Sequence, residues 1–519
     1  MAKRPFSIDS RPDRRAFLVG GLALVGAGAL YGPSLFARPR WAASPFTLGV
    51  ASGDPSADGV VIWTRLALDP LNGGGMPPAA VEVGWEVASD DAMKNIVKKG
   101  RAQAVAVWAH SVHVEVDGLA PNRRYWYRFN AGDAVSPVGR TRTLPRPGDR
   151  ADRLRFAFAS CQNFETGYFT PYRHMAAEDL DLVFHLGDYI YESGGRDGRL
   201  RKHVGAEIMT LTDYRNRHAQ YRTDPDLQAA HAAFPFVVTP DDHEVENNYA
   251  AELSENNDPR EMFLARLSAA YQAYYEHMPL RKRSIPTGSS IQLYRQLSFG
   301  TLASFFVLDT RQYRSNQPCN DGNKVPCPEV FDPAATMLGP AQERWLSDGL
   351  RRSSSKWNVM PQQVMLAMVD QFAGPEARYS MDQWPGYEVE RKRLMELLAA
   401  RRAANPIVLT GDIHTSWVND LKLDYKTADA PIVGTEFVGT SITSGGDGQD
   451  VPARIPAVLD ENKFVKFHNA QRGYVSCTVT NGDWRADYQI VDFVTKPDAP
   501  KQTRASFVVK DGKPGAERL

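Results

Sequence analysis

The run Leu182-Val-Phe-His-Leu-Gly-Asp188-Tyr-Ile-Tyr191-Glu192, near the middle of the chain, combines a strand pattern with metal-capable side chains. An apolar run, residues 182–186, ends in glycine and is followed at once by Asp188. Short apolar runs of this kind are typical of buried strands in parallel sheets, and α/β folds bind ligands at the carboxyl ends of such strands. We therefore expect Asp188 to project from a strand end into a cleft, with Tyr191 shortly beyond it. The alternative for this run alone is a plain turn, because Gly and Asp are common turn formers.

The same arrangement, an apolar strand followed by polar residues, recurs five more times beyond residue 150. The other strands that we predict are Leu154–Ala159, Phe236–Thr239, Phe305–Leu308, Lys356–Met360 and Ile407–Thr410. The polar residues that follow them include Cys161, Asp242 with His243, Arg311, Gln363, and Asp412 with His414. Helical patterns stand between several of the strands, and a long one covers Arg260–His277. Six such strands predict an α/β domain whose polar residues converge on one edge.

Residues 44–145 predict a preceding β-domain. Short runs alternate apolar and polar residues and are separated by turns that contain Gly and Pro, as in a small β-sandwich. These runs are Gly59–Arg65, Val81–Val87, Ser111–Val116 and Arg124–Phe129. The segment Gly118–Tyr125 resembles the tyrosine corner of fibronectin-type-III-like domains. Thr143–Asp149, which is rich in proline and charge, is the predicted linker to a second domain, residues 150–519.

The composition sets broad limits on the function. The chain has 519 residues, enough for two or three domains. Its 61 basic and 61 acidic residues give no net formal charge. A balanced charge gives no support for nucleic acid or an anionic membrane as a bulk partner.

Residues 1–43 are predicted to be an export signal rather than part of the fold. Arg14 and Arg15, followed by Phe17-Leu18, precede an apolar stretch, Val19–Leu30, that is too short for a stable membrane span. The pattern resembles a bacterial twin-arginine signal. That resemblance implies export by the twin-arginine machinery and a periplasmic or secreted location. An uncleaved anchor and a chance arginine pair are the alternatives.

The four cysteines fall into three different settings. Cys319 and Cys327 lie eight apart in a polar loop that contains Gly and Pro, which is compatible with a local disulfide outside the cytoplasm. Cys477 lies in an alternating, strand-like run and is expected to be buried. Cys161 directly follows a predicted strand, among the polar residues of the shared edge.

The residues at the strand ends include ligands for two kinds of metal ion. The set is Cys161, Asp188, Tyr191, Asp242, His243, Asn247, Asn248, Asp412 and His414. Carboxylate and amide oxygens suit calcium, magnesium or manganese, whereas thiolate, phenolate and imidazole suit a transition metal, ferric iron above all. A carboxylate at a central strand end can bridge two cations, and Asp188 is our candidate for that bridge. The sequence thus predicts a mixed site.

Structural explanations compete with these ligand assignments. Cys161, taken alone, is more often a buried core residue than a ligand. Tyr191 could simply pack, and Asp242-His243-Glu244 could be a helix N-cap with a surface histidine. We expect His174 and His185, on a helix and a strand, to be structural.

Five motifs, taken in order, resemble those of the PhoD family of alkaline phosphatases, a branch of the calcineurin-like metallophosphoesterases. They are Phe158-Ala-Ser-Cys161, Gly187-Asp-Tyr-Ile-Tyr191, Asp241–Tyr249, Asp309–Arg314 and Gly411-Asp-Ile-His414. The resemblance runs from about Pro45 to Val509. It implies a four-layer α/β sandwich core preceded by a fibronectin-III-like β-sandwich, and hydrolysis of phosphate mono- and diesters for phosphate scavenging. It also implies a site with Fe³⁺ and Ca²⁺, where a metal-bridging oxide or hydroxide attacks phosphorus.

The resemblance further implies a role for each site residue. The residues that would hold iron are Cys161, Asp188, Tyr191 and His414, and those on the calcium side are Asp188, Asp242, Asn248 and Asp412. Asn247 remains an alternative to Asn248. His243 would be the acid for the leaving group or a phosphate contact. Arg311 or Arg314 would grip the phosphate, although both could equally be partners in structural salt bridges.

Two other functions remain open at this point. One is a phospholipase-D-like activity on phospholipids, which exposed apolar residues at the mouth of the site, such as Trp384 and Tyr387, would favour. The other is a non-catalytic cell-surface binding protein in which the metals are only structural. The number of metal-capable side chains at one edge argues against the second.

Overall fold

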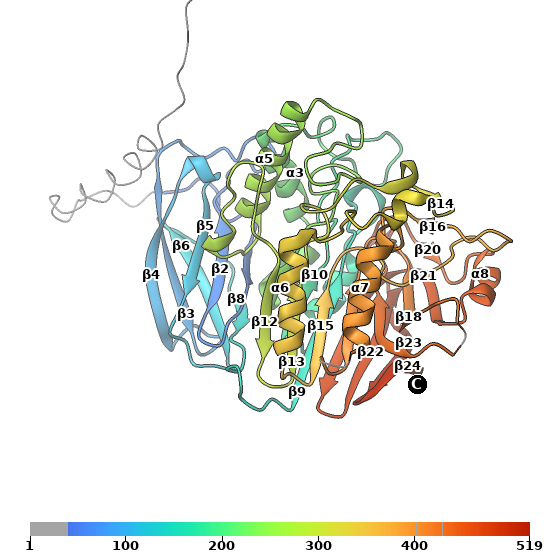
Figure 1. The fold of residues 1–519 in the computed structure, drawn as a ribbon. Helices are drawn as coiled ribbons and strands as arrows, with labels where there is room; N and C mark the ends of the chain where they lie inside the picture. Colours follow the sequence, from blue (N-terminus) through green and yellow to red (C-terminus); the bar gives the residue numbers. More distant parts are fainter. Residues whose placement is uncertain (1–39, 401–402, 428) are drawn as a thin grey trace, which may run out of the picture. The chain divides into compact units, whose positions relative to one another are not determined.

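Two sheets that pack face to face form the centre of the fold (Figure 1). The structure, a computed structural model, describes residues 40–400, 403–427 and 429–519. Residues 1–39, most of the predicted export signal, lie outside the described residues. None of the described helices combines the length and the apolarity that a bilayer crossing requires.

The first sheet contains the apolar run of residues 182–186. Three predicted strands are parallel neighbours in it, β9 (Arg153–Ala159), β10 (Leu182–His185) and β11 (Pro235–Val238). The antiparallel strands that extend this sheet are β21 (Val465–Thr480), β22 (Asp483–Val491), β23 (Lys501–Lys510) and β24 (Lys513–Arg518). Every residue of β10 is buried. The continuous apolar run therefore reflects a strand covered on both faces.

The second sheet holds the other three predicted strands, which are also parallel. They are β13 (Ala303–Val307), β15 (Trp357–Pro361) and β17 (Pro406–Thr410). The strands that complete this sheet are β12 (Arg295–Phe299), β19 (Ile432–Val438) and β18 (Ser416–Lys422). Strand β21 belongs to both sheets, because residues 465–469 pair with β18 and residues 475–480 pair with β9.

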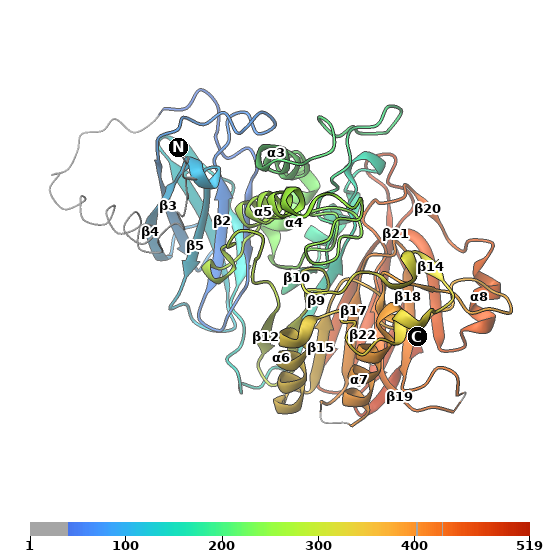
Figure 2. The same cartoon turned by 45° about the horizontal axis from the view of Figure 1, so that its top comes forward.

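Helices cover the outer face of each sheet, which gives four layers. Those on the first sheet are α2 (Thr170–Ala176), α3 (Leu211–Arg222), α4 (Pro225–Ala233) and α5 (Arg260–His277), and those on the second are α6 (Gly339–Arg352) and α7 (Glu388–Ala399). In Figure 2, helices α3–α5 lie on the opposite side of the strands from α6 and α7. Phe305 of the second sheet contacts Phe156 and Phe184 of the first, with ring centroids 5.6 and 4.9 Å apart. The predicted four-layer α/β sandwich is therefore confirmed.

A β-sandwich precedes the four layers, as predicted. One of its sheets is formed by β1 (Val50–Gly53), β2 (Val60–Arg65) and β5 (Ser111–Val116), and the other by β3 (Val81–Ala88), β4 (Ile96–Ala104), β6 (Arg124–Ala131), β7 (Ala134–Val135) and β8 (Gly139–Arg142). Tyr125 forms the expected corner, because its hydroxyl accepts a hydrogen bond from the Ala120 N–H at 2.9 Å. Strand β1 also pairs in parallel with β11. The sandwich and the first sheet are thus hydrogen-bonded into one continuous sheet.

The segment predicted as a linker is packed rather than free. Leu144 is buried in the core between the two large sheets, and its N–H donates to the Ser56 carbonyl at 2.8 Å. The segment packs because the apolar side chain of Leu144 is more stable when buried, although the residues around it are rich in proline and charge. The sandwich is therefore joined to the rest of the fold both by the pairing of β1 with β11 and by the packing of Leu144.

The cysteines are placed as the sequence predicts. Cys319 and Cys327 form a disulfide, and Cys477 is buried in the core between the sheets. The loop that the disulfide closes is paired with a later segment through two short strands, β14 (Asn323–Lys324) and β16 (Tyr379–Ser380). Two further short elements are β20 (Gly448–Gln449), which pairs with β21, and α8 (Ile455–Glu461).

Candidate metal centre

The carboxyl ends of strands from both sheets meet at one edge. Cys161 follows β9 and Asp188 follows β10, and the two loops are tied together because the Cys161 N–H donates to the Gly187 carbonyl at 3.1 Å. The loop after β17 approaches from the second sheet. Gly411 permits this approach, since a Cβ there would lie 2.7 Å from Ser160 Oγ. The glycine lets the second sheet bring its polar residues against those of the first.

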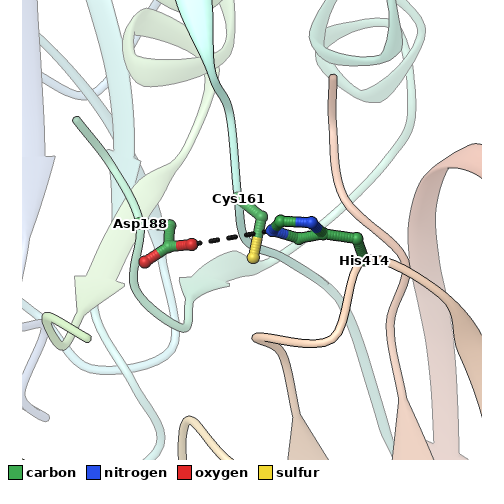
Figure 3. Close-up of side chains that lie close together, drawn as sticks. All are labelled: Cys161, Asp188 and His414. Atoms are coloured by element: carbon green, nitrogen blue, oxygen red, sulfur yellow. Dashed lines mark ion pairs between the residues drawn. The ribbon is translucent and has the colours of Figure 1, made fainter. Parts of the chain in front are cut away.

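Four side chains gather where these loops meet. The thiol of Cys161, the carboxylate of Asp188 and the imidazole of His414 lie within 4.8 Å of one another (Figure 3). The Tyr191 hydroxyl lies 2.8 Å from Asp188 Oδ2 and 3.2 Å from His414 Nε2. One sulfur, one imidazole nitrogen, one phenol and one carboxylate therefore surround the same point. This donor set suits a transition metal.

Asp188 belongs to a second cluster as well. Its carboxylate lies within 4.8 Å of ligand atoms of both Asp242 and His243. Asp188 Oδ1 is buried and accepts no hydrogen bond from the described residues. A buried carboxylate oxygen without a partner is costly. Its position between two clusters fits a carboxylate that bridges two cations.

Backbone conformation marks the same residues. The φ angles of Cys161, Asp188, Asn248, Asp412 and His414 are 60°, 55°, 48°, 66° and 59°. Residues other than glycine rarely adopt this left-handed conformation, and each instance costs roughly 1–3 kcal/mol. Such strain accumulates where function requires a particular side-chain direction. Five of the seven predicted metal ligands share it.

The electrostatics of the site favour positive ligands. Burial raises the pKa of Asp412 to about 7 and that of Glu244 to about 8, and neighbouring carboxylates add to both shifts. Burial also raises the pKa of the Cys161 thiol and the Tyr191 phenol, with the charge of Asp188 as the next cause. Burial is the larger cause of each shift, and the neighbouring carboxylates add negative charge that a cation would offset. The residues present therefore fit bound metal ions.

Asn248 is held at the site and Asn247 is turned elsewhere. The Asn248 N–H donates to Asp242 Oδ2 at 2.7 Å. The side-chain amide of Asn247 instead donates to both oxygens of Glu255 at 2.9 Å. Asp412, on the other side, accepts a hydrogen bond from Gln383 Nε2 at 3.0 Å. Of the two asparagines that the sequence left open, this geometry favours Asn248.

Arg311 does not face the open side of the site. Its side chain is fully buried, and it donates to Asp241 at 2.5 Å and to both oxygens of Asp382 at 2.8 Å. Asp242 lies 3.8 Å from the same guanidinium. Arg314 is likewise committed, to Asp382 at 3.0 Å. The contacts match the salt-bridge alternative rather than a phosphate grip.

His243 is paired with Glu192, a residue for which the sequence predicted no role in the site. His243 Nδ1 lies 2.7 Å from Glu192 Oε2, and the imidazole tilts against the Tyr191 ring at a centroid distance of 4.1 Å. Burial opposes protonation of His243, but the carboxylates of Glu192 and Asp188 raise its pKa well above the usual range. His243 also lines an open cleft. The pair is therefore an imidazolium–carboxylate at the edge of the site.

The sequence did not predict the roles of Glu244 and Ser444, because each forms hydrogen bonds with a site residue that is distant in sequence. Glu244 accepts hydrogen bonds from the N–H groups of Asp188 and Asp241, at 3.2 and 2.8 Å, and so joins two loops. Ser444 Oγ lies 2.6 Å from the Tyr191 hydroxyl. Glu192 and Glu244 stand inside the quoted motifs, so their carboxylates were a usable signal. Ser444 has no such signal.

Two polar clefts border the candidate site. The first, of about 290 Å³, is lined by residues that include Tyr191, His243 and Arg196. The second, of about 540 Å³, is lined by residues that include Asn248 and Asp321. Glu255 lines both. A substrate could therefore extend to either side of the metal-capable residues.

The apolar mouth that would favour a lipid substrate is absent at the two positions named for it. Trp384 is 1% exposed, and its Nε1 donates to Gln362 Oε1 at 3.1 Å. Tyr387 is fully buried and accepts a hydrogen bond from Arg314 Nη2 at 2.9 Å. Both aromatic rings pack in the core beside α7. Neither ring is exposed at the mouth of the site, so these two residues give the phospholipid alternative no support.

Comparison with known proteins gives matches over most of the chain. A sequence model of the PhoD-like phosphatases matches residues 156–488, and one of the N-terminal domain of PhoD-like phosphatases matches residues 33–145. Alkaline phosphatase D of Bacillus subtilis (strain 168) is 53% identical over 519 residues, which cover 98% of this chain and 89% of that protein. A solved structure described as the structure of PhoD superposes with a TM-score of 0.91 and 55% identity, and the match covers 93% of both chains.

Proposed function

The chain belongs to the PhoD-like phosphatase family, and from this premise we propose an exported alkaline phosphatase and phosphodiesterase with an iron–calcium centre. As a member of that family it is a phosphoric ester hydrolase. The observation that carries the finer proposal is the position of Asp188, whose carboxylate belongs to both clusters of ligand atoms. One cluster offers a thiol and an imidazole, and the other offers carboxylates and an imidazole.

The two clusters suit two different ions. Ferric iron would be held by Cys161, Asp188, Tyr191 and His414, because thiolate, phenolate and imidazole are its donors. Calcium would be held by Asp188, Asp242, Asn248 and Asp412, because it prefers oxygen ligands. When bound, such cations lower the pKa of a coordinated water and neutralise charge on the phosphoryl oxygens.

The protein groups around the ions supply orientation and a proton. Glu192 accepts from His243 Nδ1 and thereby leaves Nε2 for the leaving oxygen of the ester. Arg311 spans Asp241 and Asp382 and so keeps the end of β11 and the later loop at a fixed spacing. In our proposal His243 touches the substrate, whereas Arg311 acts only through the carboxylates that it holds.

The proposal also includes export and a purpose. The twin-arginine pattern in residues 1–43 supports passage by the twin-arginine machinery. The Cys319–Cys327 disulfide supports an oxidising compartment, the periplasm or the cell exterior. Phosphate released there would serve phosphate acquisition. Phosphate esters are the expected partners.

Hydrolysis of bis(p-nitrophenyl) phosphate tests the proposal. The full chain, loaded with iron, should be active in calcium, inactive after chelation and active again when calcium returns. Asp188→Asn should abolish both metal binding and turnover. Asp450→Asn is the matched control, because Asp450 pairs with Arg504 on the surface. No turnover in calcium by a chain shown to hold iron would reject the broad esterase.

A further inference from the structure

The loop closed by the Cys319–Cys327 disulfide reaches the candidate site through one carboxylate. Asp321 Oδ2 accepts a hydrogen bond from Asn248 Nδ2 at 2.7 Å. An ionised carboxylate can only accept, so the amide nitrogen of Asn248 must face Asp321. The amide oxygen Oδ1 then points the other way. None of the described residues donates a hydrogen bond to that oxygen.

Asn248 is fixed at three points, of which Asp321 is one. Its N–H donates to Asp242 Oδ2 at 2.7 Å, and its carbonyl accepts from Gln317 Nε2 at 2.7 Å. These two bonds fix the backbone of a residue whose φ is 48°. Among the described residues, Asp321 alone forms a hydrogen bond with the side chain of Asn248. The direction of the amide oxygen therefore depends on Asp321.

Asp321 itself stands in a strained turn. Cys319, Asn320 and Asp321 are consecutive non-glycine residues with positive φ, of 57°, 59° and 57°. Non-glycine residues in that conformation cost roughly 1–2 kcal/mol each and persist only where neighbours enforce them. The enforcement here comes from the disulfide, from the Met381 N–H that donates to the Gly322 carbonyl at 3.0 Å, and from the β14–β16 pair.

The charge of Asp321 is also directed at the site rather than cancelled. Its Oδ1 is buried and accepts no hydrogen bond from the described residues. No described lysine or arginine forms an ion pair with Asp321; the nearest basic residue along the chain, Lys324, is exposed and lines the same cleft. Asp321 and Asn248 line the same cleft. An uncompensated carboxylate behind an amide ligand increases the attraction for a cation.

We infer that Asp321 is a positioning residue for calcium binding by Asn248, and that the Cys319–Cys327 disulfide is what places it. The inference rests on the proposed function, because it takes Asn248 as a calcium ligand. Breaking the disulfide releases the strained turn, so Asp321 leaves Asn248 and the amide oxygen loses its direction. The calcium side of the centre therefore requires oxidised Cys319 and Cys327, whereas the iron side does not.

Calcium titration of the iron-loaded full chain, freed of calcium by a chelator, tests this inference. Asp321→Ala and the double variant Cys319→Ser/Cys327→Ser should each weaken calcium binding at least tenfold in a calorimetric titration, while iron content stays unchanged. Asp321→Asn keeps an oxygen that can accept from Asn248, so it should recover part of the affinity. Asp450→Ala is the control and should bind calcium like the parent chain.

A second arm uses the parent chain with a dithiol reductant. Two electrons and two protons pass to the sulfurs of Cys319 and Cys327, and the dithiol becomes a cyclic disulfide. Calcium affinity should fall to that of the double variant, which itself should not respond to the reductant. Turnover at saturating calcium should recover in both, because the defect lies in binding rather than in kcat.

The possible outcomes separate this inference from the proposed function. A parent chain that binds no calcium would reject the iron–calcium centre and the inference with it. A parent chain that binds calcium, together with Asp321→Ala and reduced forms that bind it equally well, would reject the inference and leave the proposed function intact. Loss of iron from the variants would also reject it, because a general loosening of the site would then be the cause.

Discussion

His243 is the residue that we expect to protonate the leaving group. His243→Gln removes the acid, so kcat for an alkyl phosphodiester should fall by roughly 10²–10⁴-fold. p-Nitrophenolate leaves without a proton, and hydrolysis of bis(p-nitrophenyl) phosphate should therefore fall far less. Comparing kcat for the two esters with the same variant is the measurement.

Glu192 provides a graded version of the same test. Glu192→Gln keeps the size of the side chain but removes the charge that holds His243, so the loss should have the same ester dependence and be smaller. His174→Gln is the matched control, because the His174 imidazole forms a hydrogen bond with the Ala499 carbonyl, at 2.7 Å, and is not among the residues of the candidate site. Equal losses on both esters would exclude an acid role for His243.

Arg311 is expected to stabilise the folded protein rather than to bind the substrate. Arg311→Met would leave Asp241, Asp242 and Asp382 without their shared cation, so the free energy of unfolding should fall by about 3–5 kcal/mol. Urea denaturation measures it. Arg504→Met, which breaks an exposed pair with Asp450, should change stability by less than about 1 kcal/mol. A raised KM with unchanged stability would restore the phosphate grip.

The loop after β17 depends on Gly411 for its close approach to the first sheet. A Cβ at Gly411 would lie 2.7 and 2.8 Å from Ser160 Oγ and Cβ, so Gly411→Ala should push the loop away from the first sheet. Iron content, and the visible absorption that phenolate gives when bound to iron, should drop. Adding Ser160→Gly should restore part of both.

Gly482 offers a control for that substitution. A Cβ there would meet only Thr480 Oγ1, at 4.0 Å, and Gly482→Ala should leave iron content unchanged. If Gly411→Ala retains full iron and the double variant differs little from it, the close approach of the two sheets does not matter to the site.

The buried strands and the longest helix could be predicted from local sequence patterns. All six apolar strands beyond residue 150 are present, because a buried run needs no knowledge of its partners. Helix α5 spans the predicted residues, 260–277. Strand β4 was not predicted, because its residues 96–104 include three lysines or arginines and a glycine and only its last residue is buried. Its strand character comes from pairing with β3.

The candidate site could be predicted only in part from local sequence patterns. Cys161, Asp188, Tyr191 and His414 could be selected because each follows a strand with a donor that metals use. Asp321 and Ser444 could not, because each reaches the site through a hydrogen bond between residues far apart in sequence, 73 residues in the case of Asp321 and Asn248. The role of Arg311 was left open for the same reason, since a guanidinium suits phosphate and carboxylate equally.

Three buried histidines should make the free energy of unfolding depend on pH. Burial lowers the pKa of His185, His203 and His218 to about 3, against about 6.5 in an unfolded chain. The unfolded state therefore binds more protons below pH 6.5. Their contribution to stability is complete above that pH and is lost as the pH falls, by about 1.4 kcal/mol per pH unit for each histidine.

Denaturation of the metal-loaded chain at pH 7.5, 6.5 and 5.5 measures this loss. His218→Phe removes one titrating group that is fully buried and stacked on His277 at 4.9 Å. The variant should lose about 1 kcal/mol less than the parent between pH 6.5 and 5.5, because the unfolded imidazole is only half protonated at the start of that interval. An unchanged pH slope would show that His218 is already protonated in the folded protein.

Strand β21 has a consequence for the order of events during synthesis. Tyr191 and His414 stand 223 residues apart in the chain, and β21, which joins the two sheets that carry them, begins only at Val465. A chain leaving the ribosome thus presents Cys161 and Asp188 long before their partners exist. Contacts so distant in sequence form late in folding. The centre can therefore be filled only after translation is nearly complete, in chains whose two sheets have both folded.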